Sequence, residues 1–201
     1  PTPLQNVRRI VTGESTCALD DNGVQCWGEN RDGRAVPPAL RNPRELGVGV
    51  PFACALDDDG LKCWGGIYGQ PPPVDLINPR KLVSGGTSSC AFDDAGLHCW
   101  GRRPKHIPAA QGPREVGMGL EHICVITDGG VTCWGRDSEG QLLVPNDLVQ
   151  PVQIAAGFYH SCVIDSSGVR CWGGNEYGES TVPNDLLNPR QVAAANGFTC
   201  A

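Results

Sequence analysis

The sequence lacks any apolar run long enough to cross a bilayer, which excludes a membrane-spanning helix. Aromatic residues make up only 6% of the 201 residues, and the single methionine stands at position 118. Basic residues are also scarce, because 16 Lys and Arg stand against 22 Asp and Glu and give a formal net charge of −6. A nucleic-acid-binding chain needs a basic footprint, so we expect no nucleic-acid partner.

Catalytic motifs are missing as well: the chain has no nucleophile elbow, P-loop or paired-histidine zinc motif. Gly47-Val-Gly49 and Gly117-Met-Gly119 are halves of a dinucleotide fingerprint, but no helix pattern follows them. We interpret these glycines as strand ends. The sequence therefore predicts no enzyme, no catalytic residue, no cofactor and no metal site.

Glycine, proline and cysteine are abundant, with 27, 17 and 11 residues, a balance that suits many short elements better than long helices. Ten cysteines form pairs with eight residues between the members, and the pairs recur about every 37 residues, the signature of a repeat fold. The pairs are Cys17 and Cys26, Cys54 and Cys63, Cys90 and Cys99, Cys124 and Cys133, and Cys162 and Cys171. Cys200 opens a sixth copy, and no initiating methionine is present. We expect a fragment of a longer protein.

The segment between paired cysteines predicts a β-hairpin. Pairing Cys17 with Cys26 leaves Asp20-Asp21-Asn22-Gly23 as the turn, and glycine stands at its last position in all five copies. Alternation places Cys17 on one face of the hairpin and Trp27 on the other, so both faces are partly apolar. A blade that packs between two neighbouring blades requires such a pattern. With an upstream strand and a downstream strand, each repeat predicts four short strands.

Opposed residues in an antiparallel pair lie within the range that a disulfide bridges, so five disulfides within the hairpins are the leading hypothesis. Reduced core cysteines are the alternative. Zinc is a weaker one, because structural zinc sites favour much closer cysteines. Disulfides would indicate an oxidising compartment, and we expect a periplasmic, cell-surface or extracellular protein.

The residues also resemble a known family. Trp-Gly-x-Asn-x-x-Gly, a strand ending in Ala-Ala-Gly, and a histidine two places before the hairpin cysteine resemble the regulator of chromosome condensation repeat. The short period is similar to that of bacterial members such as β-lactamase-inhibitory protein II. The loop motif is present at 30–33 and 175–178, weakens at 137–140, and is lost in the second and third repeats.

The resemblance implies an all-β chain, a β-propeller of four-stranded blades. We expect one incomplete propeller domain over residues 1–201, with five full repeats and the start of a sixth. The predicted boundaries are 7–43, 44–79, 80–113, 114–151, 152–189 and, for the partial repeat, 190–201. Family members usually close with seven blades, which at this period needs about 256 residues. The chain is therefore expected to be part of a seven-bladed ring.

Two rims of the repeat carry candidate sites. Hairpin turns hold a run of aspartates and the adjoining strand starts hold arginines, which we interpret as turn-forming and neutralising residues, with a cation-binding rim as the alternative. Loops on the opposite rim diverge between copies, and divergent loops on a rigid scaffold are typical of partner binding, with unconstrained drift as the alternative. Candidate binding residues are Glu29, Arg31, Asp32, Tyr68, Arg102, Arg103, Lys105, Arg136, Asp137, Glu176 and Tyr177.

The sequence favours a secreted or surface-exposed scaffold, a monomer that binds a protein of unknown identity through this rim. Resemblance to eukaryotic family members implies an alternative, guanine-nucleotide exchange on a small GTPase. A propeller enzyme with a central-channel site is a second alternative, although fold alone does not grant function. His122 and His160 stand at equivalent positions, where hydrogen bonding at a strand start is favoured over a metal or acid–base role.

Overall fold

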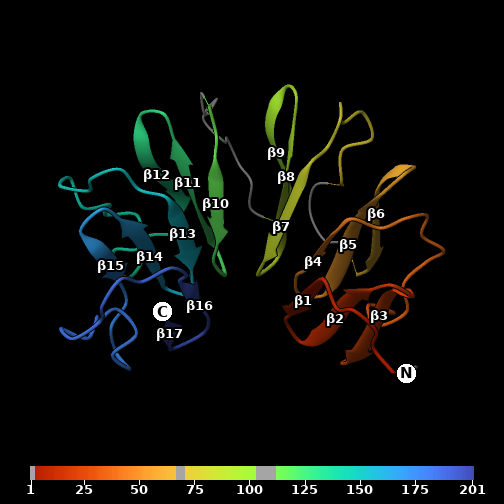
Figure 1. Cartoon of the computed structure of the whole chain (residues 1–201), viewed down its shortest axis with the longest axis horizontal. Helices are drawn as coiled ribbons and strands as arrows, with labels where there is room; N and C mark the ends of the chain where they lie inside the picture. Colours follow the sequence, from red (N-terminus) through yellow and green to blue (C-terminus); the bar gives the residue numbers. More distant parts are fainter. Residues whose placement is uncertain (1–2, 67–70, 103–111) are drawn as a thin grey trace. The chain divides into compact units, whose positions relative to one another are not determined.

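Residues 3–66, 71–102 and 112–201 are described by a computed structural model, and in these residues the chain is all-β (Figure 1). The chain divides into two compact units, residues 1–104 (unit 1) and residues 105–201 (unit 2). Each unit is described by itself. None of the described residues belongs to a helix that is long and apolar enough to span a membrane.

Unit 1 contains three antiparallel sheets, and each consists of three strands that follow one another in the chain. We call each sheet with its following loop a blade. The first sheet is β1 (Arg9–Thr12), β2 (Ser15–Asp20) and β3 (Gly23–Gly28); the second is β4 (Glu45–Val48), β5 (Phe52–Asp57) and β6 (Gly60–Gly65); the third is β7 (Lys81–Gly85), β8 (Ser88–Asp93) and β9 (Gly96–Gly101).

Unit 2 repeats the same plan with two full sheets and a shorter one. The fourth sheet is β10 (Glu115–Met118), β11 (His122–Thr127) and β12 (Gly130–Gly135); the fifth is β13 (Gln153–Ala156), β14 (His160–Asp165) and β15 (Gly168–Gly173); the sixth pairs only β16 (Ala193–Ala194) with β17 (Thr199–Cys200).

The hairpin register agrees with the sequence prediction. Cys17 lies opposite Cys26, and Leu19 lies opposite Val24. Gly23 closes the turn with φ of 105°, and the equivalent glycines of the other four hairpins also have positive φ. A residue with a side chain would be strained in this backbone conformation, which explains why glycine recurs at the position.

All five predicted disulfides are present, and they confirm the leading hypothesis for the ten paired cysteines. The Cα atoms of each pair lie 4.0 to 4.1 Å apart, as expected for directly opposed residues of a hairpin. Cys200 is a free, exposed cysteine. Each disulfide therefore joins neighbouring strands of one blade and does not cross-link blades.

The full blades differ from the prediction in one respect, because among the residues that the structure describes each has three strands and not four. The segment expected as a fourth strand at Val182 is irregular, and so are the equivalent segments around Val36 and Val144. Each valine is followed by a proline, which has no amide hydrogen to donate to a ladder. The backbone turns back at this point instead, with the amide of Val36 donating to the Gly33 carbonyl (3.1 Å).

The core is a series of small clusters between consecutive blades. In unit 1, Trp64 of the second blade lies in one buried cluster with Cys17 and Leu19 of the first blade. In unit 2, Trp172 of the fifth blade lies in one buried cluster with Cys124 and Ile126 of the fourth. Both faces of each central strand are consequently buried, and β5, β8, β11 and β14 are buried along their whole length.

Candidate interaction surface

The Asn-x-x-Gly loops are built by their own motif residues. Asn30 accepts a hydrogen bond from the amide of Ala35 (2.9 Å), and Asn175 accepts one from the amide of Ser180 (2.9 Å). Asp137 plays the same part in the fourth blade. Gly33, Gly140 and Gly178 adopt φ of 76°, 78° and 83°, the left-handed region that favours glycine. The motif residues therefore hold the loop in shape, and Asp137, one of the predicted binding residues, is part of this framework and is also exposed.

The residue after the loop glycine fixes the loop to the next blade. Arg34, Gln141 and Glu179 hold this position, and all three are buried. The carbonyl oxygen of Arg34 accepts the indole hydrogen of Trp64 (2.8 Å), and that of Gln141 accepts the indole hydrogen of Trp172 (2.9 Å). Each loop is thus tied to the blade that follows it, which limits its movement.

The first blade presents a charged cluster at this loop. The Arg31 side chain is 85% exposed and its Nε lies 3.5 Å from a carboxylate oxygen of Glu29. Asp32 accepts a hydrogen bond from the buried Arg34 (2.8 Å), which also pairs with Glu14. The structure therefore brings together Glu29, Arg31 and Asp32, and leaves Arg31 the most accessible of them.

In unit 2 the corresponding surface combines arginine with aromatic rings. Arg136 donates to Glu121 (2.9 Å), a contact that raises the pKa of the guanidinium, and lies 5.9 Å from the ring centre of Tyr159. The rings of Phe158 and Tyr159 meet edge to face at 6.3 Å. Tyr177 is 75% exposed, and its backbone is held by a hydrogen bond to Glu179 (2.8 Å).

The remaining predicted residues have mixed outcomes. Glu176 is exposed, and Arg102 is exposed with its amide bonded to the Thr87 carbonyl (3.0 Å). Tyr68, Arg103 and Lys105 lie outside the described residues. The predicted positions are therefore described for each unit by itself.

Sequence reasoning missed Tyr159. This residue precedes β14, the second strand of the fifth blade, and the turn between the first two strands lies at the same end of the blade as the loop that follows the third. The expected topology could have revealed this residue, because a meander of three strands brings its first turn and its final loop to the same end of the blade. The prediction considered only the final loop.

The aspartates at the hairpin turns, on the opposite rim, accept hydrogen bonds from within their own blade. Asp20, Asp57, Asp93 and Asp165 are buried, and each accepts the backbone amide of a residue 15 or 16 positions earlier: Gln5, Arg41, Ile77 and Val149. Burial raises the pKa of Asp57, but hydrogen bonds from Lys62 and from the amides of Arg41 and Asp59 outweigh it and leave the pKa below its ordinary value.

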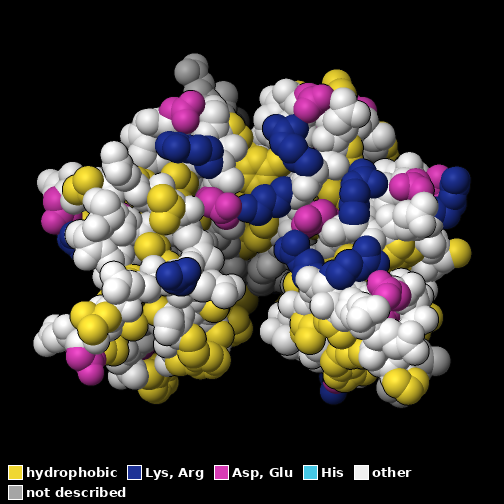
Figure 2. Space-filling model, viewed as in Figure 1, with side chains coloured by type: hydrophobic (Ala, Val, Ile, Leu, Met, Phe, Trp, Pro, Cys, Tyr) yellow, Lys and Arg dark blue, Asp and Glu magenta, His cyan; other side chains and the backbone are white. Residues whose placement is uncertain are grey.

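The arginines of this rim also serve the fold. Arg8 donates to the carbonyl of Asp20 (2.8 Å), Arg44 to that of Asp57 (2.6 Å) and Arg114 to that of Thr127 (2.9 Å). Figure 2 shows basic and acidic side chains near one another on the viewed face. Within residues 3–66, 71–102 and 112–201, no three His, Cys, Asp or Glu side chains are grouped to hold a metal ion. The structure supports the turn-forming interpretation of these residues.

The two equivalent histidines link blades within unit 2. His122 Nε2 lies 2.8 Å from Ser161 Oγ on the fifth blade, and His160 Nε2 lies 2.8 Å from Thr199 Oγ1 on the sixth. Burial lowers the pKa of His122 to about 4, and burial also lowers the pKa of His160. Both are neutral at pH 7, in agreement with the predicted hydrogen-bonding role.

The repeated three-stranded blades, stacked through small interblade clusters, define a β-propeller type of fold. Residues 114–141 and 152–179 match the model of the regulator of chromosome condensation (RCC1) repeat. These two segments lie in the fourth and fifth blades, and the match is to the same repeat that the sequence motifs resemble. No curated protein sequence matches the chain.

Solved structures show the same fold. The entire ectodomain of the Physcomitrella patens receptor kinase CR4 aligns with a TM-score of 0.76 and 21% identity over 95% of this chain, which spans 60% of that ectodomain. The ectodomain of the Arabidopsis thaliana receptor kinase ACR4 aligns with a TM-score of 0.76 and 24% identity over 100% of this chain and 78% of its own. Prp20p of Saccharomyces cerevisiae aligns with a TM-score of 0.73 and 18% identity over 96% and 67%.

Proposed function

We propose that this chain is a secreted or surface-exposed, non-catalytic scaffold that binds a protein partner through the Asn-x-x-Gly loops. One observation supports this most: motif residues turn inward and hold the loop, while the variable residues Arg31 and Tyr177 project outward. A rigid loop loses little backbone freedom on binding, which favours affinity.

The residue types of unit 2 fit a protein partner. Tyrosine and arginine are enriched among the residues that dominate binding energy in protein interfaces. Arg136, Tyr159 and Tyr177 provide these types on one edge of the unit, and Arg136 is already oriented by Glu121. The exposed ring of Tyr177 supplies apolar area with few rotatable bonds.

The five disulfides support an oxidising compartment, because such bonds do not persist in a reducing cytosol. Two of the similar structures are ectodomains of receptor kinases, and at identities below 25% they support the shared fold alone.

Photocrosslinking tests the proposal. A photoreactive residue at Tyr177, and a matched one at exposed Asp128 on the opposite rim, are placed in otherwise identical chains and offered to proteins of the extracellular fraction. We expect a protein adduct from position 177 that Tyr159→Ala and Arg136→Ala reduce at least tenfold and that position 128 does not give. Equal adducts from both rims would overturn the proposal.

Guanine-nucleotide exchange is the second candidate, favoured by the fold shared with Prp20p, a structure described together with its binding to Gsp1p and histones. Exchange requires the chain to accelerate release of a labelled guanine nucleotide from a small GTPase. We expect no acceleration over the spontaneous rate, and a catalysed release would replace the scaffold proposal with this one.

A further inference from the structure

The segment between β6 and β7 of unit 1 contains three consecutive prolines, Pro71 to Pro73, followed by Val74. The Val74 side chain is 100% exposed, the highest value among the large apolar residues of the described chain. Pro71 and Asp75 are exposed as well, and Pro72 and Pro73 are half-buried. An apolar run of the second blade is therefore open to solvent.

The prolines restrict the backbone of this segment. A proline ring fixes φ at about −65°, and a residue that precedes a proline avoids the helical region. Pro71 and Pro72 meet both conditions, so each is confined to the polyproline II conformation. This conformation has no internal hydrogen bonds and leaves the backbone to solvent. Within the described part of the chain, residues 71–75 accordingly make no hydrogen bond or ion pair.

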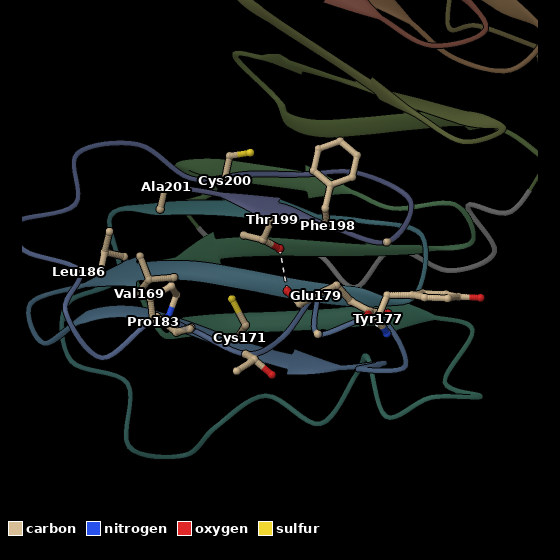
Figure 3. A pocket seen from close by; sticks show the side chains of 14 residues that line it. Val169, Cys171, Tyr177, Glu179, Pro183, Leu186, Phe198, Thr199, Cys200 and Ala201 are labelled. Atoms are coloured by element: carbon tan, nitrogen blue, oxygen red, sulfur yellow. Dashed lines mark hydrogen bonds between the residues drawn. The ribbon is translucent and has the colours of Figure 1, made fainter.

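The corresponding segment of the fifth blade is a closed, polar turn. Pro183 is followed by Asn184 and Asp185, and the amide of Leu186 donates back to the carbonyl of Pro183 (3.4 Å). Leu186 packs against the buried cluster that includes Val169 of β15, and the two side chains lie beside each other in Figure 3. In this blade the proline begins a turn, and two polar residues complete it.

The second blade keeps the anchor of this arrangement but not its turn. Leu76 packs against the buried cluster that contains Trp100. The amide of the next residue, Ile77, donates to the buried carboxylate of Asp93 (2.9 Å). Among the described residues, no hydrogen bond closes the backbone between Pro73 and Leu76. The proline run is therefore held firmly at its downstream end while the run itself stays open.

The first blade offers an internal comparison. It has two consecutive prolines at the same place, Pro37 and Pro38, and the valine there, Val36, precedes them. The carbonyl of the following residue, Ala39, accepts a hydrogen bond from the side chain of Lys62 (3.4 Å). This shorter run is therefore partly satisfied within unit 1, which makes it a matched control for the longer run of the second blade.

We propose that Pro71 to Val74 is a ligand for a partner protein that holds a polyproline II segment in a groove lined by aromatic side chains. Aromatic rings pack against the proline rings and Val74, and donors of the groove bind the free carbonyl groups. Because the conformation is already formed, binding costs little backbone entropy. The segment is distinct from the Asn-x-x-Gly loops, so the inference does not rest on the function proposed above.

Asp75 defines the charge of that groove. Its exposed carboxylate directly follows Val74 and pairs with no cation among the residues that the structure describes. Asp147 holds the same place in the fourth blade, one residue before the anchoring leucine, and is paired with Arg170 (2.9 Å). A lysine or arginine at the end of the groove would give Asp75 the partner that Asp147 has within its own unit. The partner is therefore an aromatic groove with a basic end.

The test offers the whole chain to purified WW, SH3 and EVH1 domains, whose aromatic grooves hold proline-rich segments. Only the domains carry an isotope label, so NMR follows the indole signal of the groove tryptophan without interference from the tryptophans of this chain. We expect a saturable shift of that signal in at least one domain. The absence of a saturable shift in all three would overturn the proposal.

Two double variants locate the binding. Pro71→Ala/Pro73→Ala releases the backbone of the longer run and is expected to weaken binding at least tenfold. Pro37→Ala/Pro38→Ala makes the same change in the first blade and is expected to bind like the unchanged chain. Equal effects of the two variants would show that the groove recognises another part of the chain, and would overturn the proposal.

A third variant tests the charge of the groove. Asp75→Asn keeps the shape of the side chain and removes its charge, so it should weaken binding and reduce the dependence of binding on salt. Val74 and the prolines are unchanged in this variant, and the aromatic contacts should remain. An unchanged affinity and salt dependence would overturn the assignment of a basic end to the groove.

Discussion

The carboxylate of Asp57, at the end of β5, accepts a hydrogen bond from the backbone amide of Arg41, sixteen residues earlier and outside any strand (2.9 Å). The same carboxylate accepts the amide of Asp59 and pairs with Lys62 (2.8 Å). One buried side chain thus joins the hairpin tip to the segment that enters the blade. Asp20, Asp93 and Asp165 repeat this link.

Replacing Asp57 should therefore destabilise the protein more than replacing its neighbour. Asp57→Ala leaves two backbone amides without their acceptor, and we expect a loss of about 2 kcal/mol in the free energy of unfolding. Asp58→Ala removes an exposed contact with Asn42 and should cost about 0.5 kcal/mol. Urea denaturation of both variants measures the difference, and equal losses would contradict the role assigned to Asp57.

The linked aspartates predict acid sensitivity. Their pKa values are below the ordinary value in the folded protein, so the unfolded chain binds protons more readily as the pH falls. Their contribution to stability is complete above about pH 4 and is lost as the pH falls further through the folded pKa values. The urea midpoint should fall steeply in that range, and less steeply for Asp57→Ala than for the unchanged protein.

His122 predicts a second pH dependence, at higher pH. Its folded pKa of about 4 lies below the ordinary value of 6.5, so between these values the unfolded state binds the proton. Its effect is absent above about pH 6.5, and stability should fall by up to about 1.4 kcal/mol per pH unit as the pH drops toward 4. His122→Gln should flatten this slope, as followed by denaturation midpoints at several pH values.

Each hairpin disulfide is predicted to add to the free energy of unfolding. Each closes a ring of ten residues, for which the chain-entropy model gives about 2.7 kcal/mol. The double variant Cys162→Ser/Cys171→Ser should lose about that free energy of unfolding, whereas Cys200→Ser should lose none, because Cys200 is free and exposed. A double variant as stable as the unchanged chain would show that the bond adds nothing to the hairpin.

Trp64 and Trp27 form a matched pair for testing how much the interblade clusters stabilise the protein. Trp64 is buried and donates to Arg34, so Trp64→Ala should cost about 3–5 kcal/mol. Trp27 occupies the same place in its blade but is much more exposed, and Trp27→Ala should cost less than half as much. Thermal and urea denaturation measure both, and similar losses would mean that the interblade cluster does not stabilise the chain.

Local spacing allowed the hairpins to be predicted in detail, since the eight residues between cysteines determine the register, and with it the place of Gly23 and the pairing of Cys17 with Cys26. The fourth strand expected downstream of each hairpin is absent at Val36, Val144 and Val182, where the following proline prevents it. The link between Asp57 and Arg41 could not be predicted, because a backbone amide leaves no trace in the sequence.

The candidate surface was predicted in outline only. Comparison of the repeats shows that Tyr177 stands at a variable position of the loop, between conserved motif positions. Only the fold shows that Glu179 is buried and that the ring of Tyr159 lies next to Arg136. Such relations depend on contacts between consecutive repeats, and spacing within one repeat does not contain them. The structure describes two compact units. The single domain over residues 1–201 and its repeat boundaries therefore stay predictions.

The Cys54–Cys63 bond encloses the acidic tip that includes Asp58 and Asp59. A protease that cuts the backbone between these two aspartates severs the chain but releases no fragment, because the sulfur bridge still joins the two sides. Nicked protein would migrate as a single band on a denaturing gel until a reductant is added. For a protein exposed to extracellular proteases, damage at such a tip would be covalently contained.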